Sequence, residues 1–234
     1  MKEGGPFIGV LMLDTAFPRP LGDAGNSASY GVPARLRVVP KAETLEIVRD
    51  GLPAEALVQG FIAAARALEA EGAVAIVSTC GFLILVQRRI AASVSVPVML
   101  SAMSLLPLVK AVHGGAPVGV LTASAAQLGP GMLEAAGVSK ADVRIAGLEA
   151  CSAFSQAILV PKELQPATLD EAAIGAAVVA KAQALCAATP EISALVLECG
   201  NLPPYAAAIE MATGRPVYSI LDGARLIAVR GFPG

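Results

Sequence analysis

The chain has 234 residues, a net charge of −2 and 55% hydrophobic residues, and only 4% of its residues are aromatic. This length allows one large domain or two small ones, each with a real hydrophobic core. No cluster of Lys and Arg is present, and such a cluster supplies most of the affinity in nucleic-acid binding. The composition therefore excludes the usual nucleic-acid-binding classes.

The four cysteines and the single histidine narrow the chemistry further. The cysteines have neither CxxC nor Cys/His spacing, which argues against a zinc site and against a disulfide scaffold. His113 lies at an expected helix end, where a basic side chain complements the helix dipole. We interpret it as structural, and we expect the protein to use no metal and no cofactor.

The sequence also bears on membranes and targeting. No uncharged apolar run reaches the roughly 18 residues that a membrane-spanning helix needs, and the longest, 73–86, is interrupted by Ser, Thr and Gly. Residues 1–6 have none of the apolar character of a signal peptide. We expect a soluble, cytoplasmic protein with no membrane partner and no nucleic-acid partner.

The first part of the chain alternates strands and helices. Apolar runs bounded by Gly, Pro or polar residues predict strands, and apolar spacings of three and four predict helices. The predicted order is a strand at 7–13, a loop at 14–33, a strand at 36–39, a helix from 53 to about 72, a strand at 74–78, a helix at 82–92, a strand at 97–100 and a helix at 105–112. Because the loop 14–33 is long and rich in Pro and Gly, we expect it to cover a binding site.

The second part repeats this order. The predicted elements are a strand at 117–122, a helix after a capping box at Ser124 and Gln127, a strand at 142–146, a second long loop at 147–166, a helix to 187 opened by a capping box at Thr168 and Glu171, a strand at 192–197, a helix at 203–212, a strand at 216–219 and a helix at 221–229. The strands are continuous apolar runs rather than alternating ones. Such runs indicate parallel sheets that are covered on both faces.

One motif occurs in both parts of the chain. Cys80-Gly81 and Cys199-Gly200 each follow a short apolar strand, and each cysteine precedes a Pro-Val pair by 17 residues. The matching offsets indicate an internal duplication. We predict an α/β fold of two pseudo-symmetric lobes, each a mostly parallel sheet flanked by helices, spanning 1–105 and 106–219, with the active site between them. Whether the C-terminal helix at 220–234 packs back on the first lobe is left open.

The two cysteines lie where ligands gather in parallel sheets, outside the carboxyl ends of the strands. Each is followed by an expected helix N-terminus, whose dipole and free N–H groups stabilise a thiolate or bind a carboxylate. Glycine after each cysteine lets the backbone approach a ligand closely. The predicted substrate-binding residues are Asp14, Asn26, Thr79, Gly81, Thr122, Gly200 and Asn201.

Two thiols that face one small acid predict proton transfer at the carbon beside a carboxylate or carbonyl. One thiolate removes the proton from one side and the other thiol returns a proton from the opposite side, which inverts the carbon. Cys80 and Cys199 are the predicted catalytic residues. Cys151 and Cys186 have no counterpart in the other lobe, and we interpret them as bystanders.

Three charged residues carry weaker signals than this pair. Arg19 and Arg35 are candidates to meet a distal carboxylate, although exposed arginines are ordinary. Glu198, directly before the second cysteine, is assigned no role.

These motifs resemble the aspartate/glutamate/hydantoin racemase superfamily over essentially the whole chain. The resemblance rests on four stretches: 8–11 leading to Asp14-Thr15, 78–81, 119–122, and 198–205 with the sequence ECGNLPPY. It implies two α/β lobes with the active site between them and a cofactor-independent pair of catalytic cysteines at Cys80 and Cys199. It also places Thr79, Asn201 and Thr122 beside them.

Some features depart from the superfamily pattern. Glycine follows both cysteines here, whereas many amino-acid racemases carry Asn-Thr after the first, and no histidine stands beside Cys199. These differences argue against aspartate or glutamate as the substrate. Keeping both cysteines argues against the related decarboxylase, which keeps one.

The predicted function is that of an isomerase, a cofactor-independent racemase or epimerase acting on a small carboxylate, amino acid or hydantoin, in a homo-oligomer. One alternative is a maleate-type cis–trans isomerase with a nucleophilic cysteine. The other is a non-catalytic protein that binds small acids.

Overall fold

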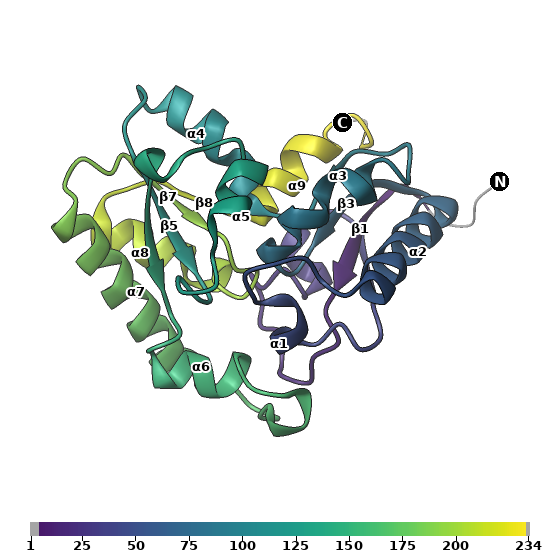
Figure 1. Ribbon diagram of the computed structural model, residues 1–234, viewed down its shortest axis with the longest axis horizontal. Helices are drawn as coiled ribbons and strands as arrows, with labels where there is room; N and C mark the ends of the chain where they lie inside the picture. The colour runs from purple at the N-terminus through teal and green to yellow at the C-terminus, as the bar shows by residue number, and fades with distance from the viewer. Residues whose placement is uncertain (1–4, 233–234) are drawn as a thin grey trace.

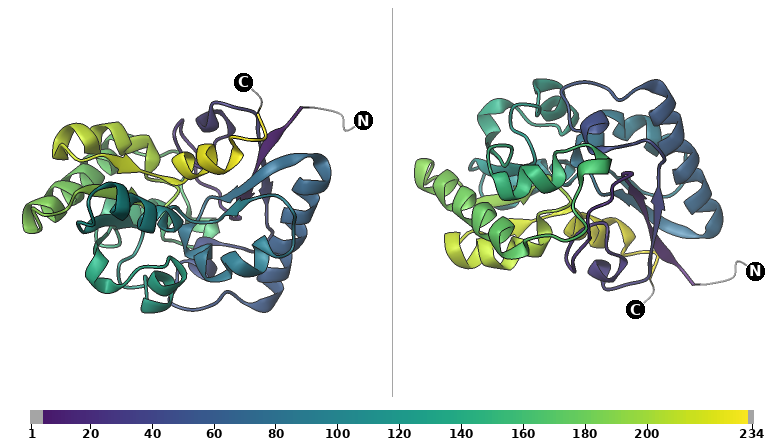
Figure 2. Two further views of the ribbon diagram at one scale, coloured as in Figure 1. Left: turned by 90° about the horizontal axis from the view of Figure 1, so that it is seen from above. Right: turned by 90° about the horizontal axis from the view of Figure 1, so that it is seen from below.

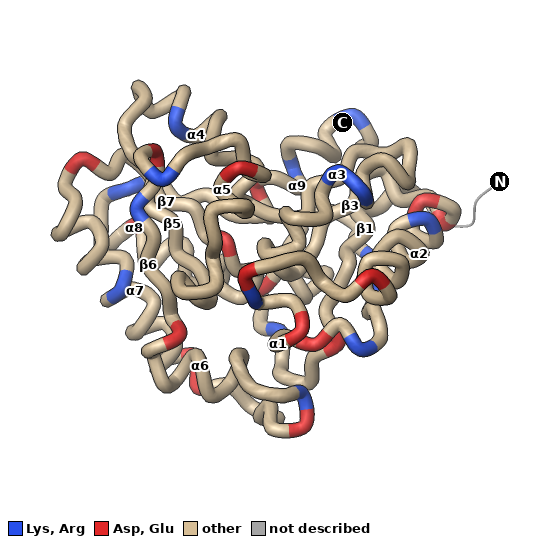
Figure 3. The backbone as a smooth tube through the Cα atoms, viewed as in Figure 1, with Lys and Arg blue, Asp and Glu red and all other residues tan. Residues whose placement is uncertain are grey.

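The computed structural model describes residues 5–232, which form two lobes lying side by side (Figure 1). Residues 1–4, on which the predicted absence of a leader partly rests, lie outside the described residues. Basic and acidic residues are interspersed along the chain in both lobes (Figure 3).

Each lobe is built on a four-stranded parallel sheet. The first sheet has the order β2-β1-β3-β4 and the second has the order β6-β5-β7-β8. The strands of the first are β1 (Phe7–Met12), β2 (Ala34–Val38), β3 (Ala73–Ser78) and β4 (Val98–Met99). Those of the second are β5 (Val118–Thr122), β6 (Val143–Gly147), β7 (Ala194–Leu197) and β8 (Val217–Tyr218). The identical strand order confirms the predicted pseudo-symmetric α/β fold.

The helices cover both sheets. They are α1 (Thr44–Ile47), α2 (Glu55–Glu71), α3 (Gln87–Ala91), α4 (Leu106–Val112), α5 (Pro130–Ala135), α6 (Ser152–Ile158), α7 (Glu171–Ala188), α8 (Ala206–Thr213) and α9 (Ile220–Ala228). The long helix α2 packs on β1 and β3 in the first lobe, and α7 packs on β5, β6 and α8 in the second. The two lobes thus use corresponding helices for corresponding faces.

The repeated glycine of the first strand in each lobe has a packing reason. In β1, a Cβ added at Gly9 would lie 3.1 Å from a methyl carbon of Leu68 on α2. In β5, a Cβ at Gly119 would overlap Leu195 of the neighbouring strand. Because interiors are close-packed, the missing side chains let the neighbouring groups sit close to the first strand of each sheet.

The C-terminal helix α9 packs back on the first sheet, against β3 and β4 (Figures 1 and 2). A capping box between Ser219 and Asp222 starts this helix. Gly223 then brings its backbone against Met99 of β4, where an added Cβ would overlap the sulfur. The question that the sequence left open is thereby answered for residues 220–228, while the exact domain boundary after residue 105 stays a prediction.

Two predictions were wrong, one of a loop and one of a helix cap. The stretch 147–166 contains α6, which buries Phe154 and Ile158; this i, i+4 apolar pair is the helical signal that the flanking Gly and Pro obscured. The cap of α7 is Asp170, whose carboxylate accepts from the Ala173 N–H, rather than Thr168. The helix begins later than the capping-box pattern suggested.

The other differences are local. The predicted helix at 82–92 is a 3₁₀ turn, Gly81–Val86, followed by the short α3. Gln127 caps no helix, because its side chain accepts from the Asp50 N–H in the other lobe. The short helix α1 was not predicted.

Helix α7 is long and apolar enough, by length and composition, to cross a membrane. In the fold it packs against α6, α8 and the second sheet, with Ile174, Val178 and Ala182 buried. A core helix of a soluble protein passes the same test, so this helix alone is weak evidence for a membrane segment.

Candidate active site

The two Cys-Gly motifs meet where the sheets face each other. The backbones of Cys80 and Cys199 form an isolated antiparallel bridge between the lobes. A Cβ on Gly200 would lie 2.9 Å from the Thr79 carbonyl carbon, and one on Gly81 would lie 2.8 Å from Ser101 Oγ, with Glu198 closer still. Neither glycine has a positive φ. Their role is therefore close approach of the two strand ends.

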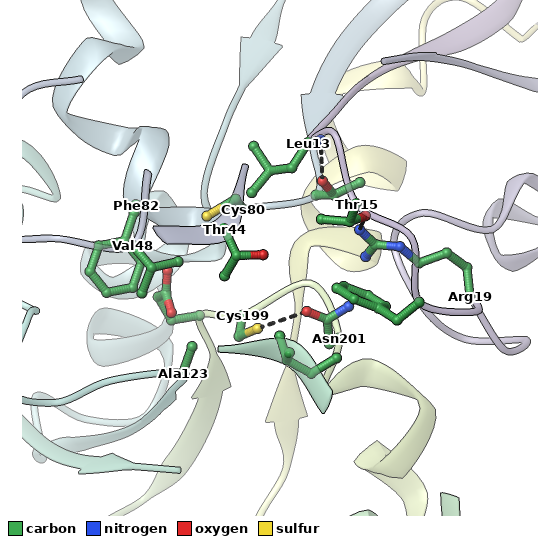
Figure 4. Close-up of a pocket in the computed structure, with 14 residues that line it drawn as sticks. Leu13, Thr15, Arg19, Thr44, Val48, Cys80, Phe82, Ala123, Cys199 and Asn201 are labelled. Atoms are coloured by element: carbon green, nitrogen blue, oxygen red, sulfur yellow. Dashed lines mark hydrogen bonds between the residues drawn. The ribbon is translucent and has the colours of Figure 1, made fainter. Parts of the chain in front are cut away.

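A cavity lies at this junction and is lined from both lobes (Figure 4). Its free space for water-sized molecules is about 20 Å³, room for roughly one or two waters. The lining residues are Leu13, Thr15, Phe17, Arg19, Thr44, Val48, Thr79, Cys80, Phe82, Ala123, Ile158, Glu198, Cys199 and Asn201. The walls are mainly apolar with a few convergent polar groups, which is typical of small-molecule sites.

The Cys199 thiol is held by a polar chain that starts in the loop 14–33. Its S–H donates to Asn201 Oδ1 over 3.4 Å (Figure 4), and Asn201 Nδ2 donates to Asp23 over 2.8 Å. Asp23 in turn pairs with Arg19 at 3.1 Å. This chain of hydrogen bonds favours the protonated form of Cys199, because the thiol can donate to the asparagine oxygen and a thiolate cannot.

Arg19 brings a positive charge to the cavity wall. Its side chain is 9% exposed, donates to Thr15 Oγ1 over 2.8 Å and stacks over the Phe17 ring at 4.3 Å. Asp23, 2% exposed, offsets part of this charge. The loop 14–33 therefore supplies both an apolar wall and a paired charge. The sequence had made Arg19 a candidate to meet a distal carboxylate.

The Cys80 side is built differently. Ser78 Oγ accepts from the Cys80 N–H over 3.2 Å, and the Thr79 hydroxyl accepts from the Leu13 N–H over 3.3 Å. These bonds hold the backbone at the strand end. No side-chain acceptor within the described residues holds the Cys80 S–H in the way that Asn201 holds Cys199, so the two thiols are unequal.

The residue that sequence reasoning missed is Glu198. It is 2% exposed, lines the cavity and accepts from Thr122 Oγ1 over 2.8 Å. Burial raises its pKa from 4.5 to about 7, while hydrogen bonds from Thr122 and the Ala123 backbone partly oppose the shift. A carboxylate ending an apolar strand, directly before the cysteine, was the available signal.

Burial also raises the pKa of both thiols, and the nearby Glu198 carboxylate raises them further. For Cys80 the Phe82 backbone and the Arg19 charge lower the pKa. For Cys199 the Asn201 backbone lowers it, but the charges of Cys80 and Asp23 add to the increase. Cys80 is therefore the better placed of the two to carry a negative charge.

The other predicted site residues lie outside the cavity lining. Thr122 reaches the site only through Glu198. Asn26 caps the turn at Ser27–Tyr30 and donates to the Arg19 carbonyl, so it shapes the loop. Asp14 pairs with Lys162 of the second lobe and accepts from the Lys41 N–H.

The Asp14–Lys162 pair belongs to a set of contacts that join the lobes beside the cavity, which Thr15 and Thr44 line. Gln165 Oε1 accepts from the Ala16 N–H over 2.7 Å, and Gln165 Nε2 lies 3.4 Å from Thr44 Oγ1. The Lys162 ammonium lowers the pKa of Asp14. These contacts join the loop 14–33 and α1 to the segment after α6.

Among the described residues 5–232, no group of three or more His, Cys, Asp or Glu side chains could hold a metal ion. The arrangement offers instead two thiols, a buried carboxyl group and a paired arginine around one small cavity.

The fold is shared with several solved structures. The chain matches unliganded arylmalonate decarboxylase with a TM-score of 0.55 and 17% identity, over 96% of this chain and 92% of that one. It matches the aspartate racemase of Picrophilus torridus (TM-score 0.57, 14% identity, 97% and 94% covered) and the allantoin racemase of Klebsiella pneumoniae (0.57, 14%, 96% and 89%). The fold is that of the aspartate/glutamate/hydantoin racemase superfamily, as predicted.

Sequence similarity is higher to a different group of enzymes. No family model matches the chain. A dimethylsulfoniopropionate lyase of Durusdinium sp. clade D is 30% identical over 96% of this chain and 74% of its own length. Dimethylsulfoniopropionate lyase 3 of Emiliania huxleyi is 30% identical over 91% of the chain, which spans only 56% of that relative. The chain belongs to the dimethylsulfoniopropionate lyase family, and it is an enzyme.

Proposed function

We propose that the protein is a cofactor-independent lyase that removes a proton beside a carboxylate and expels a leaving group from the next carbon. The observation that carries this proposal is the unequal thiol pair at one cavity between the lobes. The lyase relatives support it, since they match nearly the whole chain. Dimethylsulfoniopropionate, a propionate with a dimethylsulfonium group on C3, is the proposed substrate.

The chemistry needs one base. A thiolate takes a proton from C2, the C2–C3 double bond forms, and the electrons of the C3–S bond leave with sulfur. The products are dimethyl sulfide and acrylate, and the proton remains on the thiol. Because dimethyl sulfide leaves as a neutral molecule, the step requires no general acid at the leaving group.

We assign the base to Cys80. Arg19 and the Phe82 backbone favour its thiolate, whereas Cys199 donates to Asn201 and faces Asp23. In this role Cys199 remains a thiol that packs against the substrate. The Arg19 guanidinium and the Thr15 hydroxyl are the groups that receive the substrate carboxylate.

The charges at the cavity favour a zwitterion over a dicarboxylate. Glu198 and Asp23 are buried near the thiols, and Arg19 is the cation that faces them. A sulfonium cation would reduce the cost of forming a thiolate there, because opposite charges within a few ångströms favour the charged form of an acid. A second carboxylate would raise that cost. The Phe82 ring also lines the cavity, and an aromatic ring attracts a cation to its face.

The second candidate is the predicted racemase, which the approach of thiols from opposite lobes favours. Both reactions begin with the same proton transfer. They differ in the second thiol, which a racemase needs as the proton donor and the elimination does not.

The test is incubation of the purified chain with dimethylsulfoniopropionate, with headspace chromatography for dimethyl sulfide and proton NMR for acrylate. Equal amounts of the two products are expected. Aspartate and allantoin enantiomers serve as a parallel panel. Racemisation of one of them without release of dimethyl sulfide would refute the lyase and establish the racemase.

A further inference from the structure

The buried carboxyl group of Glu198 is only half satisfied. One oxygen, Oε2, accepts from Thr122. The other, Oε1, is buried and has no hydrogen-bond partner. An unsatisfied buried acceptor costs about 1–3 kcal/mol, and more when charged. A carboxylate that served only to join β7 to β5 would need no such unpaired oxygen inside the protein.

The position of Glu198 relates it to both thiols. It directly precedes Cys199 at the end of β7, and it lines the same cavity as Cys80. Its Oε1 faces the backbone of Gly81, the residue after Cys80, where an added Cβ would overlap it. The carboxyl group therefore lies at the junction of the two Cys-Gly motifs.

The groups around Glu198 come from several elements. Cys80 follows β3, Cys199 follows β7, and Arg19 and Asp23 come from the loop 14–33. Thr122 of β5 and Ser101, beside Gly81, are the neutral polar side chains nearby. Asp23 is already paired with Arg19. Glu198 is thus the carboxylate left to exchange a proton with the thiols.

We propose that Glu198 is the internal proton acceptor that converts the Cys80 thiol into its thiolate before the substrate reacts. The Cys80 S–H bond breaks, the proton moves to Glu198 by way of a water molecule in the cavity that both residues line, and the negative charge moves from oxygen to sulfur. The total charge of the cavity does not change. The thiolate then takes the C2 proton, and Glu198 releases its proton to solvent when products leave. This role rests on the lyase function proposed above.

The burial of Glu198 suits this task. Its pKa of about 7 makes it a stronger base than an ordinary carboxylate, and this reduces the difference between its pKa and that of the thiol. General acid–base groups work best when their pKa lies near the working pH. The pair then loses its first proton near neutrality, although the pKa of each buried thiol is raised.

The test is the pH dependence of kcat/KM in wild type and Glu198→Gln. Glutamine keeps the size of the side chain and an oxygen that accepts from Thr122. Wild type is expected to gain activity as pH rises through about 7. Above that pH wild type should level off, because the thiol passes its proton to Glu198 rather than to solvent. In Glu198→Gln the thiol must release its proton to solvent, so activity should keep rising by about tenfold for each pH unit up to the thiol pKa. A Glu198→Gln profile that levels off at the same pH as wild type would overturn the proposal.

A second variant supports the same measurement. Thr122→Val removes a hydrogen bond that stabilises the charged form of Glu198, so the rise in activity should move to higher pH. In the Glu198→Gln background, Thr122→Val should leave the pH at which activity rises unchanged. An equal shift in both backgrounds would contradict the proposal, since it would show that Thr122 acts without Glu198.

A measurement without substrate separates this inference from the lyase proposal. The carboxyl carbon of Glu198 can be followed by carbon-13 NMR and assigned by its absence in Glu198→Gln. A midpoint near 7 is expected. A midpoint in the ordinary carboxyl range refutes the proton acceptor even if dimethyl sulfide is released. A midpoint near 7 with no release of dimethyl sulfide refutes the lyase alone.

Discussion

The close approach of the two strand ends can be tested by adding a single methyl group. In Gly200→Ala the new Cβ would lie 2.9 Å from the Thr79 carbonyl carbon and closer to its oxygen, with Ala24 at 3.1 Å. The obstacle is backbone, so the two lobes must separate by roughly 1 Å at this point to restore ordinary contact. The two thiols move apart with them.

The magnitude follows from packing and from alignment. Overpacking of this kind costs about 1–3 kcal/mol of folding free energy. A displacement of about 1 Å at reacting groups lowers the rate by on the order of a hundredfold. We therefore expect Gly200→Ala to fold, with a lower urea midpoint and a kcat reduced by about two orders of magnitude.

The matched control is Gly131→Ala in α5, where the nearest atom to the new Cβ is a Leu85 methyl carbon at an ordinary 3.8 Å. This helical position should gain stability, by about 0.5–1 kcal/mol, and keep full activity. The assay is urea unfolding together with dimethyl sulfide release. Unchanged stability and kcat in Gly200→Ala would refute the close contact between the motifs.

Three further predictions concern the thiols, the Asp14–Lys162 ion pair and Glu198. Cys80→Ser should lower kcat for dimethyl sulfide release at least a thousandfold, on the order of a lost general base, whereas Cys199→Ser should cost far less; equal losses would point to the racemase. Lys162→Met should remove the ion pair with Asp14 and raise KM more than it lowers kcat. High salt should have the same effect on wild type. A variant with unchanged KM would show that the pair does not support substrate binding. The pKa of Glu198 is higher in the folded chain than its ordinary 4.5, so the folded state binds the proton more tightly and stability falls as pH rises from about 4.5 to about 7. Glu198→Gln should flatten this part of the curve in urea unfolding at a series of pH values, by on the order of 3 kcal/mol, and a parallel curve would contradict the raised pKa.

Much of the fold could be predicted because its signals are local. Continuous apolar strands indicated parallel sheets, and the repeated spacing from cysteine to Pro-Val indicated two equivalent halves. The sequence also predicted that Cys80 and Cys199 lie at corresponding strand ends, and in the structure these strand ends meet at one junction. Helix α6 was missed because Gly147 and the nearby prolines suggested a loop.

The composition of the site was harder to predict because it depends on contacts between distant segments. Glu198 follows an apolar strand, and only the fold shows that one of its oxygens is buried without a partner. Asn26 looked like a binding residue in a long loop, yet its side chain is used by the loop itself. Arg19 gains its position from Asp23 and Thr15, and no local pattern reports that arrangement.

The central claim is that a thiolate removes the C2 proton of a sulfonium-bearing propionate. The most direct measurement is a competition between dimethylsulfoniopropionate and the same compound carrying deuterium at C2, followed by mass spectrometry of the substrate that remains. If proton removal limits the reaction, the remaining substrate should become enriched in deuterium as dimethyl sulfide is released. The claim would be contradicted if the two forms were consumed at the same rate and Cys80→Ser released dimethyl sulfide as fast as wild type.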